Sequence, residues 1–228
     1  MVSEEFAMPD VLDWLGSPAF TAFGAPTSNA ELLGFVTGVL CVWLVARQRV
    51  LNWPVGIASC LFFILLFTDA GLYGDASLQV VFILLGLWGW ARWLAGRRST
   101  EKMPVSRSSH QEWLGYAVAL VVGAAVMWAF LDQFTSSTVP LADGLTTTLS
   151  LIATYGQIKK RVECWYFWIA ADLVYIPLYQ HKGLTLTALL YIGFACLCVY
   201  GLLDWRRSER TERSVEVLPL TTAAQGMA

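Results

Sequence analysis

Long stretches of this sequence carry no charged side chain, and this constrains the fold more than any other feature. Six runs contain no Asp, Glu, Lys or Arg, and a seventh is interrupted only by Asp172. Crossing the hydrocarbon core of a bilayer takes roughly 20 helical residues, and these runs approach that length. They are too continuous for the alternating strands of a membrane barrel. The runs are residues 32–46, 50–68, 76–91, 113–131, 144–158, 164–181 and 183–203.

The composition leaves little room for anything except membrane helices. Only 14% of the 228 residues are charged and 57% are apolar, whereas soluble domains carry about a quarter charged residues. Seven spans use most of the apolar content, so a separate globular domain does not fit. The net charge of -2 gives no reason to expect a nucleic-acid partner. We therefore expect an all-α polytopic membrane protein with seven transmembrane helices.

Basic residues fall into every second loop. Arg47 and Arg49 follow the first run, and further clusters follow the third, fifth and seventh runs, whereas the other loops are acidic or nearly neutral. Because Lys and Arg concentrate in cytoplasmic loops, we expect an external N-terminus and a cytoplasmic C-terminus in a bacterial-type inner or plasma membrane. Residues 1–30 are then an extracellular segment, 96–112 a basic cytoplasmic loop and 206–228 a cytoplasmic disordered tail.

The chain contains an internal repeat. When the sequence is shifted by 112 positions, residues 49–93 align with residues 161–205 without a gap. Chance matching of apolar residues does not produce paired tryptophans, glycines and arginines in one register. These pairs are Arg49 and Arg161, Trp53 and Trp165, Gly71 and Gly183, Gly89 and Gly201, and Trp93 and Trp205.

Each copy of the repeat holds three of the expected helices. Residues 31–95 form the first three-helix repeat, residues 143–205 form the second, and residues 113–131 form a linker helix between them. The shift covers an even number of spans, so both copies enter the membrane in the same direction. A parallel repeat is the pattern of SWEET-type transporters, whose site lies between the copies near mid-membrane. We expect this SWEET-like 3+1+3 arrangement.

The two copies differ most in their middle helix, where a site would have specialised. Gly56 of the first copy is replaced by Trp168, and Cys60 is replaced by Asp172. Together with Trp165, these second-copy residues occupy one helix face at i, i+3 and i+7. A carboxylate inside a span costs roughly 2.5 to 3.5 kcal/mol and is by default functional. Two indoles and a carboxylate suit a flat, positively charged ligand.

Packing is the alternative for this set. In that case Trp168 fills space and Asp172 pairs with a neighbouring helix. For Trp165 an interfacial anchor competes evenly with ligand binding, because its counterpart Trp53 lies beside a basic loop.

Other polar residues inside the spans are weaker candidates. Gln79 and its repeat counterpart Tyr191 can bind a ligand, although bonding between helices explains them equally well. Thr147 is a further candidate, with a hydroxyl bonded back to its own helix as the alternative. Asn52 and Gln157 lie near cytoplasmic helix ends, where roles in a loop or a gate compete.

Motifs for catalysis, cofactors and metals are missing from the sequence. Its two histidines, His110 and His181, fall in expected loops, and its five cysteines form no CxxC pair. There is no HExxH, P-loop or GxSxG motif. We expect no enzyme activity, no cofactor and no metal. An intramembrane enzyme would need a second catalytic group near Asp172, and a purely structural subunit would leave that carboxylate unexplained.

Several motifs together carry a family resemblance. They are LYGDASLQ at 72–79, ECWYFWIAAD at 163–172, YIPLY at 175–179 and KGLTLTALLY at 182–191. With these motifs, residues 31–207 resemble the nicotinamide riboside transporters of the PnuC family. The substrate motif of that family, W-x-x-W-x-x-x-N, falls on Trp165, Trp168 and Asp172, with Asp in place of Asn.

The resemblance implies uptake of nicotinamide riboside by facilitated diffusion with alternating access. A cytoplasmic kinase would then trap the substrate by phosphorylation, without having to touch the transporter. Because relatives are thought to carry thiamine or riboflavin, the Asp at this position is also compatible with a related vitamin. The implied partners are this small-molecule vitamin and the lipid bilayer, and nothing in the sequence excludes a homo-oligomer.

The resemblance and the helix face together give each candidate residue a role. Trp165 and Trp168 enclose the aromatic ring of the substrate, and Asp172 binds its amide or its charge. Gln79 and Tyr191 bind the ribose or the base. Thr147 adds a hydroxyl contact.

Overall fold

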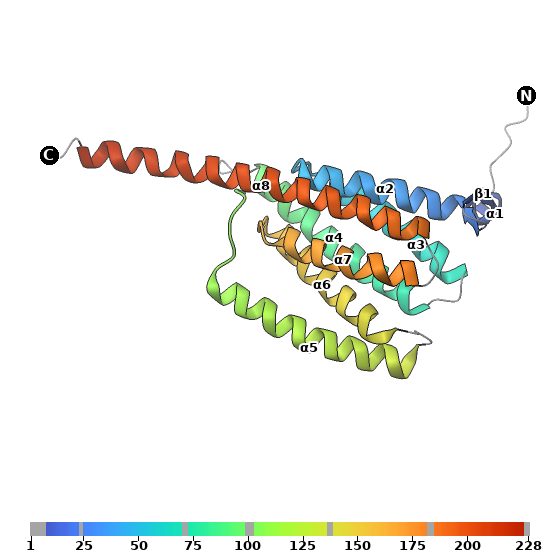
Figure 1. Ribbon diagram of the computed structural model, residues 1–228. Coiled ribbons are helices and arrows are strands. Elements are labelled where there is room, and N and C mark those ends of the chain that lie inside the picture. The colour runs from blue at the N-terminus through green and yellow to red at the C-terminus, as the bar shows by residue number, and fades with distance from the viewer. Residues whose placement is uncertain are drawn as a thin grey trace, which may run out of the picture.

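The computed structural model describes residues 8–22, 25–69, 73–98, 103–135, 139–181 and 185–225, and these residues are almost entirely helical (Figure 1). A short helix α1 (Met8–Gly16) and an antiparallel hairpin of β1 (Pro18–Ala22) and β2 (Ala25–Ser28) come first. The long helices follow: α2 (Asn29–Ala46), α3 (Asn52–Asp69), α4 (Tyr73–Arg98), α5 (His110–Phe134), α6 (Pro140–Ile158), α7 (Cys164–His181) and α8 (Thr185–Gln225).

Local sequence signals mark the starts of these helices. The Ser28 side chain accepts a hydrogen bond from the Glu31 backbone N–H and so caps α2. Ser109 and Glu112 form a reciprocal capping box at the start of α5. Pro140 occupies the first turn of α6, where a backbone N–H would have no hydrogen-bond partner within the helix, so proline costs no hydrogen bond there.

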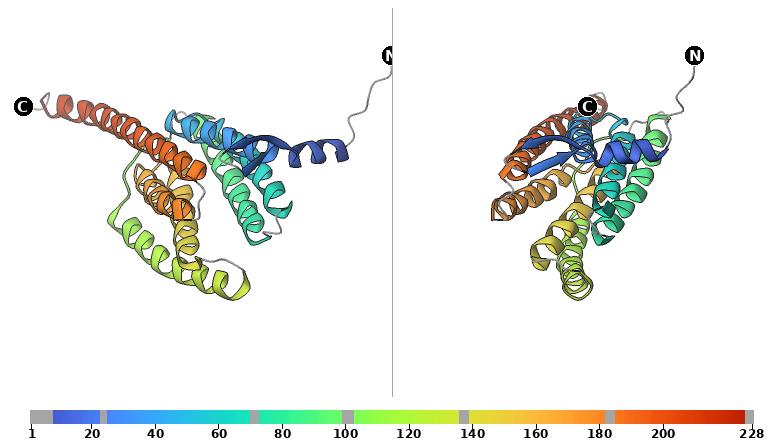
Figure 2. Two further views of the ribbon diagram at one scale, coloured as in Figure 1. Left: turned by 45° about the vertical axis from the view of Figure 1, so that its right-hand side comes forward. Right: turned by 90° about the vertical axis from the view of Figure 1, so that its right-hand side faces the viewer.

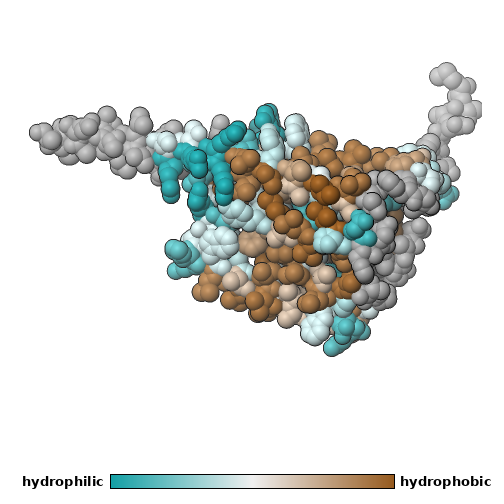
Figure 3. Space-filling model, in the orientation of Figure 1, coloured by the Kyte–Doolittle hydropathy of each residue, from teal (hydrophilic) through white to brown (hydrophobic). Residues whose placement is uncertain are grey.

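The outer surface of the bundle is apolar. Within the described residues, α2, α4, α5 and α8 are long and apolar enough to cross a membrane, and α3 and α7 hold shorter apolar segments. On α5, Leu114 is 68% exposed and Val121 is 71% exposed. Figure 3 shows hydrophobic side chains over the middle of the bundle and hydrophilic ones where α8 leaves it. Such a surface fits lipid rather than water, so the chain is a polytopic, all-α membrane protein.

The helices pack as two groups. Helices α2, α3 and α4 contact one another in chain order, as do α6, α7 and α8, and α5 lies along α6. Two further contacts join the groups, because α2 packs against α8 and α4 packs against α6. Figure 2 shows α5 on the outside of this assembly.

The internal repeat extends to the backbone conformation. Gln48, after α2, and its counterpart Lys160, after α6, both have positive φ, at 52° and 53°. In the first turn the Arg49 N–H donates to the Leu44 carbonyl at 2.9 Å. In the second turn the Arg161 N–H donates to the Gly156 carbonyl at 2.8 Å. Positive φ is uncommon for residues other than glycine. Its occurrence at both positions indicates that the two copies share their local structure as well as their sequence.

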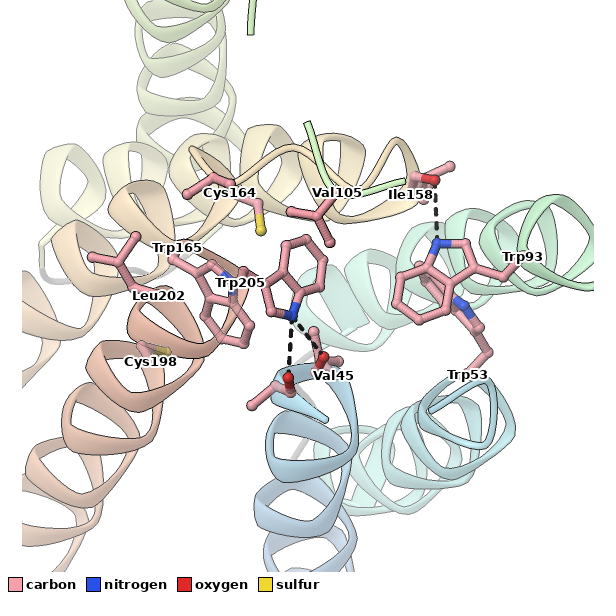
Figure 4. Close-up of a cluster of buried hydrophobic side chains, with 12 residues drawn as sticks. Val45, Trp53, Trp93, Val105, Ile158, Cys164, Trp165, Cys198, Leu202 and Trp205 are labelled. Atoms are coloured by element: carbon pink, nitrogen blue, oxygen red, sulfur yellow. Dashed lines mark hydrogen bonds between the residues drawn. The ribbon is translucent and has the colours of Figure 1, made fainter. Parts of the chain in front are cut away.

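Four tryptophans repeat one packing arrangement in both copies. Trp53 meets Trp93 edge-on, with ring centroids 5.5 Å apart and planes at 88°. Trp165 meets Trp205 at the same distance and angle. All four rings belong to the buried cluster between the copies (Figure 4).

One indole of each pair also bonds to the other copy. The Trp93 N–H donates to the carbonyl of Ile158, the last residue of α6, at 3.2 Å. The Trp205 N–H donates to the carbonyls of Val45 and Ala46 at the end of α2, at 3.1 Å and 3.2 Å (Figure 4). Because Ala46 and Ile158 are repeat counterparts, the bonds are reciprocal. We call these two pairs of tryptophans and their bonds the tryptophan clasp.

The basic segments meet at one end of the bundle. Residues 103–109 run past the turn between α6 and α7, where Ser106 forms a backbone bridge with Arg161. The neighbouring Arg107 lies 3.5 Å from the Glu209 carboxylate of α8. Loops that the sequence places on one side of the membrane therefore lie together.

The C-terminal segment differs from the sequence-based expectation. The sequence predicts a disordered tail over 206–228, but α8 continues without a break to Gln225. Arg and Glu, which dominate the start of this stretch, are good helix formers. Glu209 is also only 7% exposed, and its carboxylate lies 3.5 Å from Arg107. The mixture of charged residues with Thr and Ala, which suggested disorder, lies in a helix up to Gln225.

Replacing Gly201 or Gly89 with alanine is expected to destabilise the protein. An added Cβ would lie 2.4 Å from the Trp165 ring or 2.2 Å from the Trp53 ring. Overpacking of this kind should lower the melting temperature of the detergent-purified protein by about 5 °C in each variant. The control is Gly193→Ala on the same helix as Gly201, because nothing lies within 4 Å of a Cβ there. Equal melting temperatures for Gly201→Ala and Gly193→Ala would contradict this packing.

Candidate functional site

One face of α7 carries the residues that the sequence singles out. Trp165, Trp168 and Asp172 lie on it, and Tyr175 extends it by one turn. Asp172 is 5% exposed and Trp165 is 1% exposed, while Trp168 is half-buried. The carboxylate therefore lies inside the helix bundle and not at its lipid surface.

The Asp172 carboxyl group has hydrogen-bonding capacity to spare. Its Oδ2 is buried and has no hydrogen-bond partner within the described residues. A polar group beside it is the Cys198 thiol of α8, and none of the ion pairs between described residues includes Asp172. Leaving a buried acceptor unpaired costs roughly 1 to 3 kcal/mol. The site is thus suited to a ligand that brings a donor or a positive charge.

Trp168 lies where the two buried apolar clusters of the bundle meet. It packs against the cluster that contains the tryptophan clasp and against a second cluster formed by α5, α6 and α7. The first copy has Gly56 at this position, so an indole fills the space only in the second copy. Trp168 is half-buried rather than fully enclosed.

Trp165 lies deeper than Trp168. Its ring is packed edge-on against Trp205, and its indole N–H is buried with no partner among the described residues. Its counterpart Trp53 has the same edge-on contact and the same unpaired N–H. An interfacial anchor would lie at the lipid headgroups, whereas Trp165 lies in the core.

Tyr191 is brought to this face through Tyr175. Their ring centroids are 4.6 Å apart, which joins α8 to α7. Tyr191 also contacts Phe194, which in turn contacts Phe35 of α2. The rings form an aromatic wall from α7 across α8 to α2. Tyr175 is not among the residues predicted for the site, although its spacing of three residues from Asp172 places it on the same helix face.

Thr147 and Gln79 lie on other helices. Thr147 is buried on α6, and no hydrogen bond between described residues involves its hydroxyl, whereas Thr146 and Thr148 donate to carbonyls one turn earlier. Gln79 is half-buried on α4, the helix of the first copy that packs against α6. The six candidates therefore occupy α4, α6, α7 and α8, and the structure brings Tyr191 against the α7 face.

A groove of about 520 Å³ lies elsewhere, between α5 and α6. Small residues, Gly115, Ala119 and Gly123, leave it open along α5. Its lining is largely apolar and includes neither Trp168 nor Asp172. This groove suits a lipid chain better than a polar vitamin.

Comparison with known proteins identifies the family. Residues 28–207 match the family model described as nicotinamide mononucleotide transporter. The chain belongs to this family. The match covers α2 to α7 and the bundled part of α8, and it leaves out α1, the hairpin and the end of α8.

Two relatives of this protein are named as transporters of different vitamins. The riboflavin/roseoflavin transporter RibM of Streptomyces davaonensis is 28% identical, over 90% of this chain and 97% of that protein. The nicotinamide riboside transporter PnuC of Neisseria mucosa is 28% identical, over 86% of this chain and 79% of that protein.

A solved structure supports the same assignment. The crystal structure of the vitamin B3 transporter PnuC matches with a TM-score of 0.65 and 26% identity, over 80% of this chain and 82% of that one. The family and these relatives are transporters, so the protein is a membrane transporter and not an enzyme.

Proposed function

We propose that this transporter takes up nicotinamide riboside by facilitated diffusion with alternating access. The observation that carries the proposal is the unpaired, buried Oδ2 of Asp172 on the same helix face as the half-buried Trp168 ring. Nicotinamide riboside contains a cationic pyridinium ring with a carboxamide group. The indole can stack on that ring, and the carboxylate can accept from the amide or balance the charge. The names of two PnuC relatives support this substrate.

The remaining candidates complete the proposed site. Trp165 borders the ring site on the side of the tryptophan clasp, one turn from Trp168. Tyr191, held in the aromatic wall, and Gln79 and Thr147, on α4 and α6, supply hydrogen bonds to the ribose. A cytoplasmic kinase that phosphorylates the product keeps uptake running in one direction.

We also propose that α2 to α8 all cross the membrane, as two parallel three-helix repeats joined by α5. This SWEET-like 3+1+3 arrangement is supported by the reciprocal bonds of the tryptophan clasp and by the matched turns at Gln48 and Lys160. The basic segments that meet at one end support a cytoplasmic C-terminus and an external N-terminus. Transport then consists of rocking α2–α4 against α6–α8 around the site.

Riboflavin is the second candidate substrate. It is favoured by the riboflavin transporter relative, whose whole length is nearly covered by the match, and by Asp172, which stands where the PnuC motif has Asn. The isoalloxazine ring is flat enough to stack on Trp168, and its imide N–H can donate to the carboxylate. The two vitamins differ in charge, because riboflavin is neutral at pH 7.

The purified protein in liposomes should take up labelled nicotinamide riboside without a proton or sodium gradient. Trp168→Ala and Asp172→Ala are each expected to lower that uptake by about tenfold or more, because they remove a stacking surface or a hydrogen-bond acceptor. Leu173→Ala is the control, since Leu173 is 59% exposed on the outer side of the same helix. Full uptake by both site variants would overturn the site assignment.

The charge of Asp172 can be tested separately with Asp172→Asn. Because the PnuC motif has Asn at this position and an amide oxygen still accepts a hydrogen bond, this variant is expected to keep nicotinamide riboside uptake within about twofold of the wild type, whereas a loss of about tenfold would assign Asp172 the counter-ion role. Competition by unlabelled riboflavin and thiamine in the same assay reports which vitamins reach the site. Unchanged nicotinamide riboside uptake would refute the counter-ion role, and strong competition by riboflavin alone would favour the second candidate.

A further inference from the structure

A stripe of buried polar side chains runs along α6. Thr147, Ser150, Thr154 and Gln157 are each 7% exposed. At 3.6 residues per turn they lie within an arc of about 80° on the helix. The stripe is specific to the second copy, as Asp172 is. In α2 the corresponding positions are Phe35, Gly38, Val42 and Val45.

One end of the stripe contacts the first copy of the repeat. Thr148 contacts α5, because its side chain lies 2.7 Å from a Cβ built on Gly123. Ala153 belongs to the apolar cluster shared with α7. Between these two sides, Gln157 reaches α3, where its Nε2 donates to the Asn52 Oδ1 at 3.3 Å.

The stripe begins about one turn beyond the depth of Asp172 and passes it at Ser150. Ser150 and Asp172 each lie eight residues from the ends of α6 and α7 that meet in their connecting turn, which is about 12 Å along each helix. Thr147 and Gln157 are about 15 Å apart along the axis, or half of a hydrocarbon core about 30 Å thick. The stripe therefore runs past the level of the carboxylate to the end where the basic segments meet.

A hydrogen bond between the two copies closes this end. Asn52 is 0% exposed, and its own Nδ2 donates to the Arg49 carbonyl at 2.6 Å. That bond fixes the Asn52 Oδ1 as the acceptor for Gln157. The next residue of α6, Ile158, is the one bonded to Trp93 in the tryptophan clasp. The polar stripe thus ends at a hydrogen bond between α6 and α3, which belong to different copies of the repeat.

We propose that this stripe is the cytoplasmic half of the transport path and that the Gln157–Asn52 hydrogen bond is its gate. The proposal rests on the proposed function and deepens it, because it assigns the hydroxyl-bearing part of the substrate to α6. The hydroxyl groups of a ribose or a ribityl chain lose their hydrogen bonds to water when the substrate enters the bundle. This is unfavourable unless side chains of the bundle replace those hydrogen bonds. Such partners lie one after another along α6, at Thr147, Ser150 and Thr154. Thr154 donates to the Ser150 carbonyl at 2.8 Å and keeps its oxygen lone pairs as acceptors.

Thr154→Val and Thr148→Val form a matched pair that tests the path. Both threonines are buried on α6, and both donate to a carbonyl one turn earlier at 2.8 Å, but only Thr154 lies on the stripe. We expect Thr154→Val and Ser150→Ala to slow uptake into proteoliposomes by about fivefold each, the effect of one lost hydrogen bond. Thr148→Val should stay within about twofold of the wild type.

The uptake assay distinguishes two kinds of failure. If the wild type transports neither nicotinamide riboside nor riboflavin, the proposed function fails, and this proposal fails with it. If the wild type transports either vitamin and Thr154→Val matches Thr148→Val, only the path along α6 is refuted.

The gate is tested by thiol labelling. Ser150→Cys places a thiol on the stripe, and Thr148→Cys places one toward α5 as the control. A membrane-impermeant maleimide applied to the end that carries the basic segments should label Ser150→Cys slowly, above the background of the parent protein. Adding Gln157→Leu should raise that labelling rate by about fivefold and leave the control unchanged, because the bond to Asn52 is lost. No change in Ser150→Cys, or an equal rise in both, would refute the gate.

Discussion

Two indole N–H groups hold the halves of this transporter together. Trp93 bonds to the end of α6, and Trp205 bonds to the end of α2, so the third helix of each copy is tied to the first helix of the other. Lipid supplies no hydrophobic force between helices, so close packing and buried hydrogen bonds must do this work. The clasp fixes the ends of α2 and α6 and with them the turns that lead into α3 and α7.

The repeat separates scaffold from site. Residues that are identical between the copies, such as Trp93 and Trp205, make matching contacts in each copy and maintain the packing. The polar side chains that distinguish the second copy instead form the α7 face and the α6 stripe. Asp172 leaves an oxygen unpaired, and Gln157 bonds across to the first copy. A symmetric frame thereby holds one asymmetric site.

The sequence predicts the helices and the candidate residues more fully than it predicts their contacts. Uncharged runs locate the helices because charge is costly in lipid, and the repeat locates the Asp172 face because it shows what changed. The stacking of Tyr175 on Tyr191 and the bond from Trp205 to α2 join residues distant in sequence, so no local pattern reports them. The helical tail is not predicted, and its contact between Glu209 and Arg107 of a separate loop likewise joins residues distant in sequence.

Calorimetric titration of the purified protein with nicotinamide riboside, riboflavin and thiamine tests the central claim most directly. The first copy has Gly56 and Cys60 where the second has Trp168 and Asp172, so only one site can form between the copies. We predict saturable binding of nicotinamide riboside with one molecule per chain. Two equivalent sites per chain, or no binding of any of the three vitamins, would contradict this account.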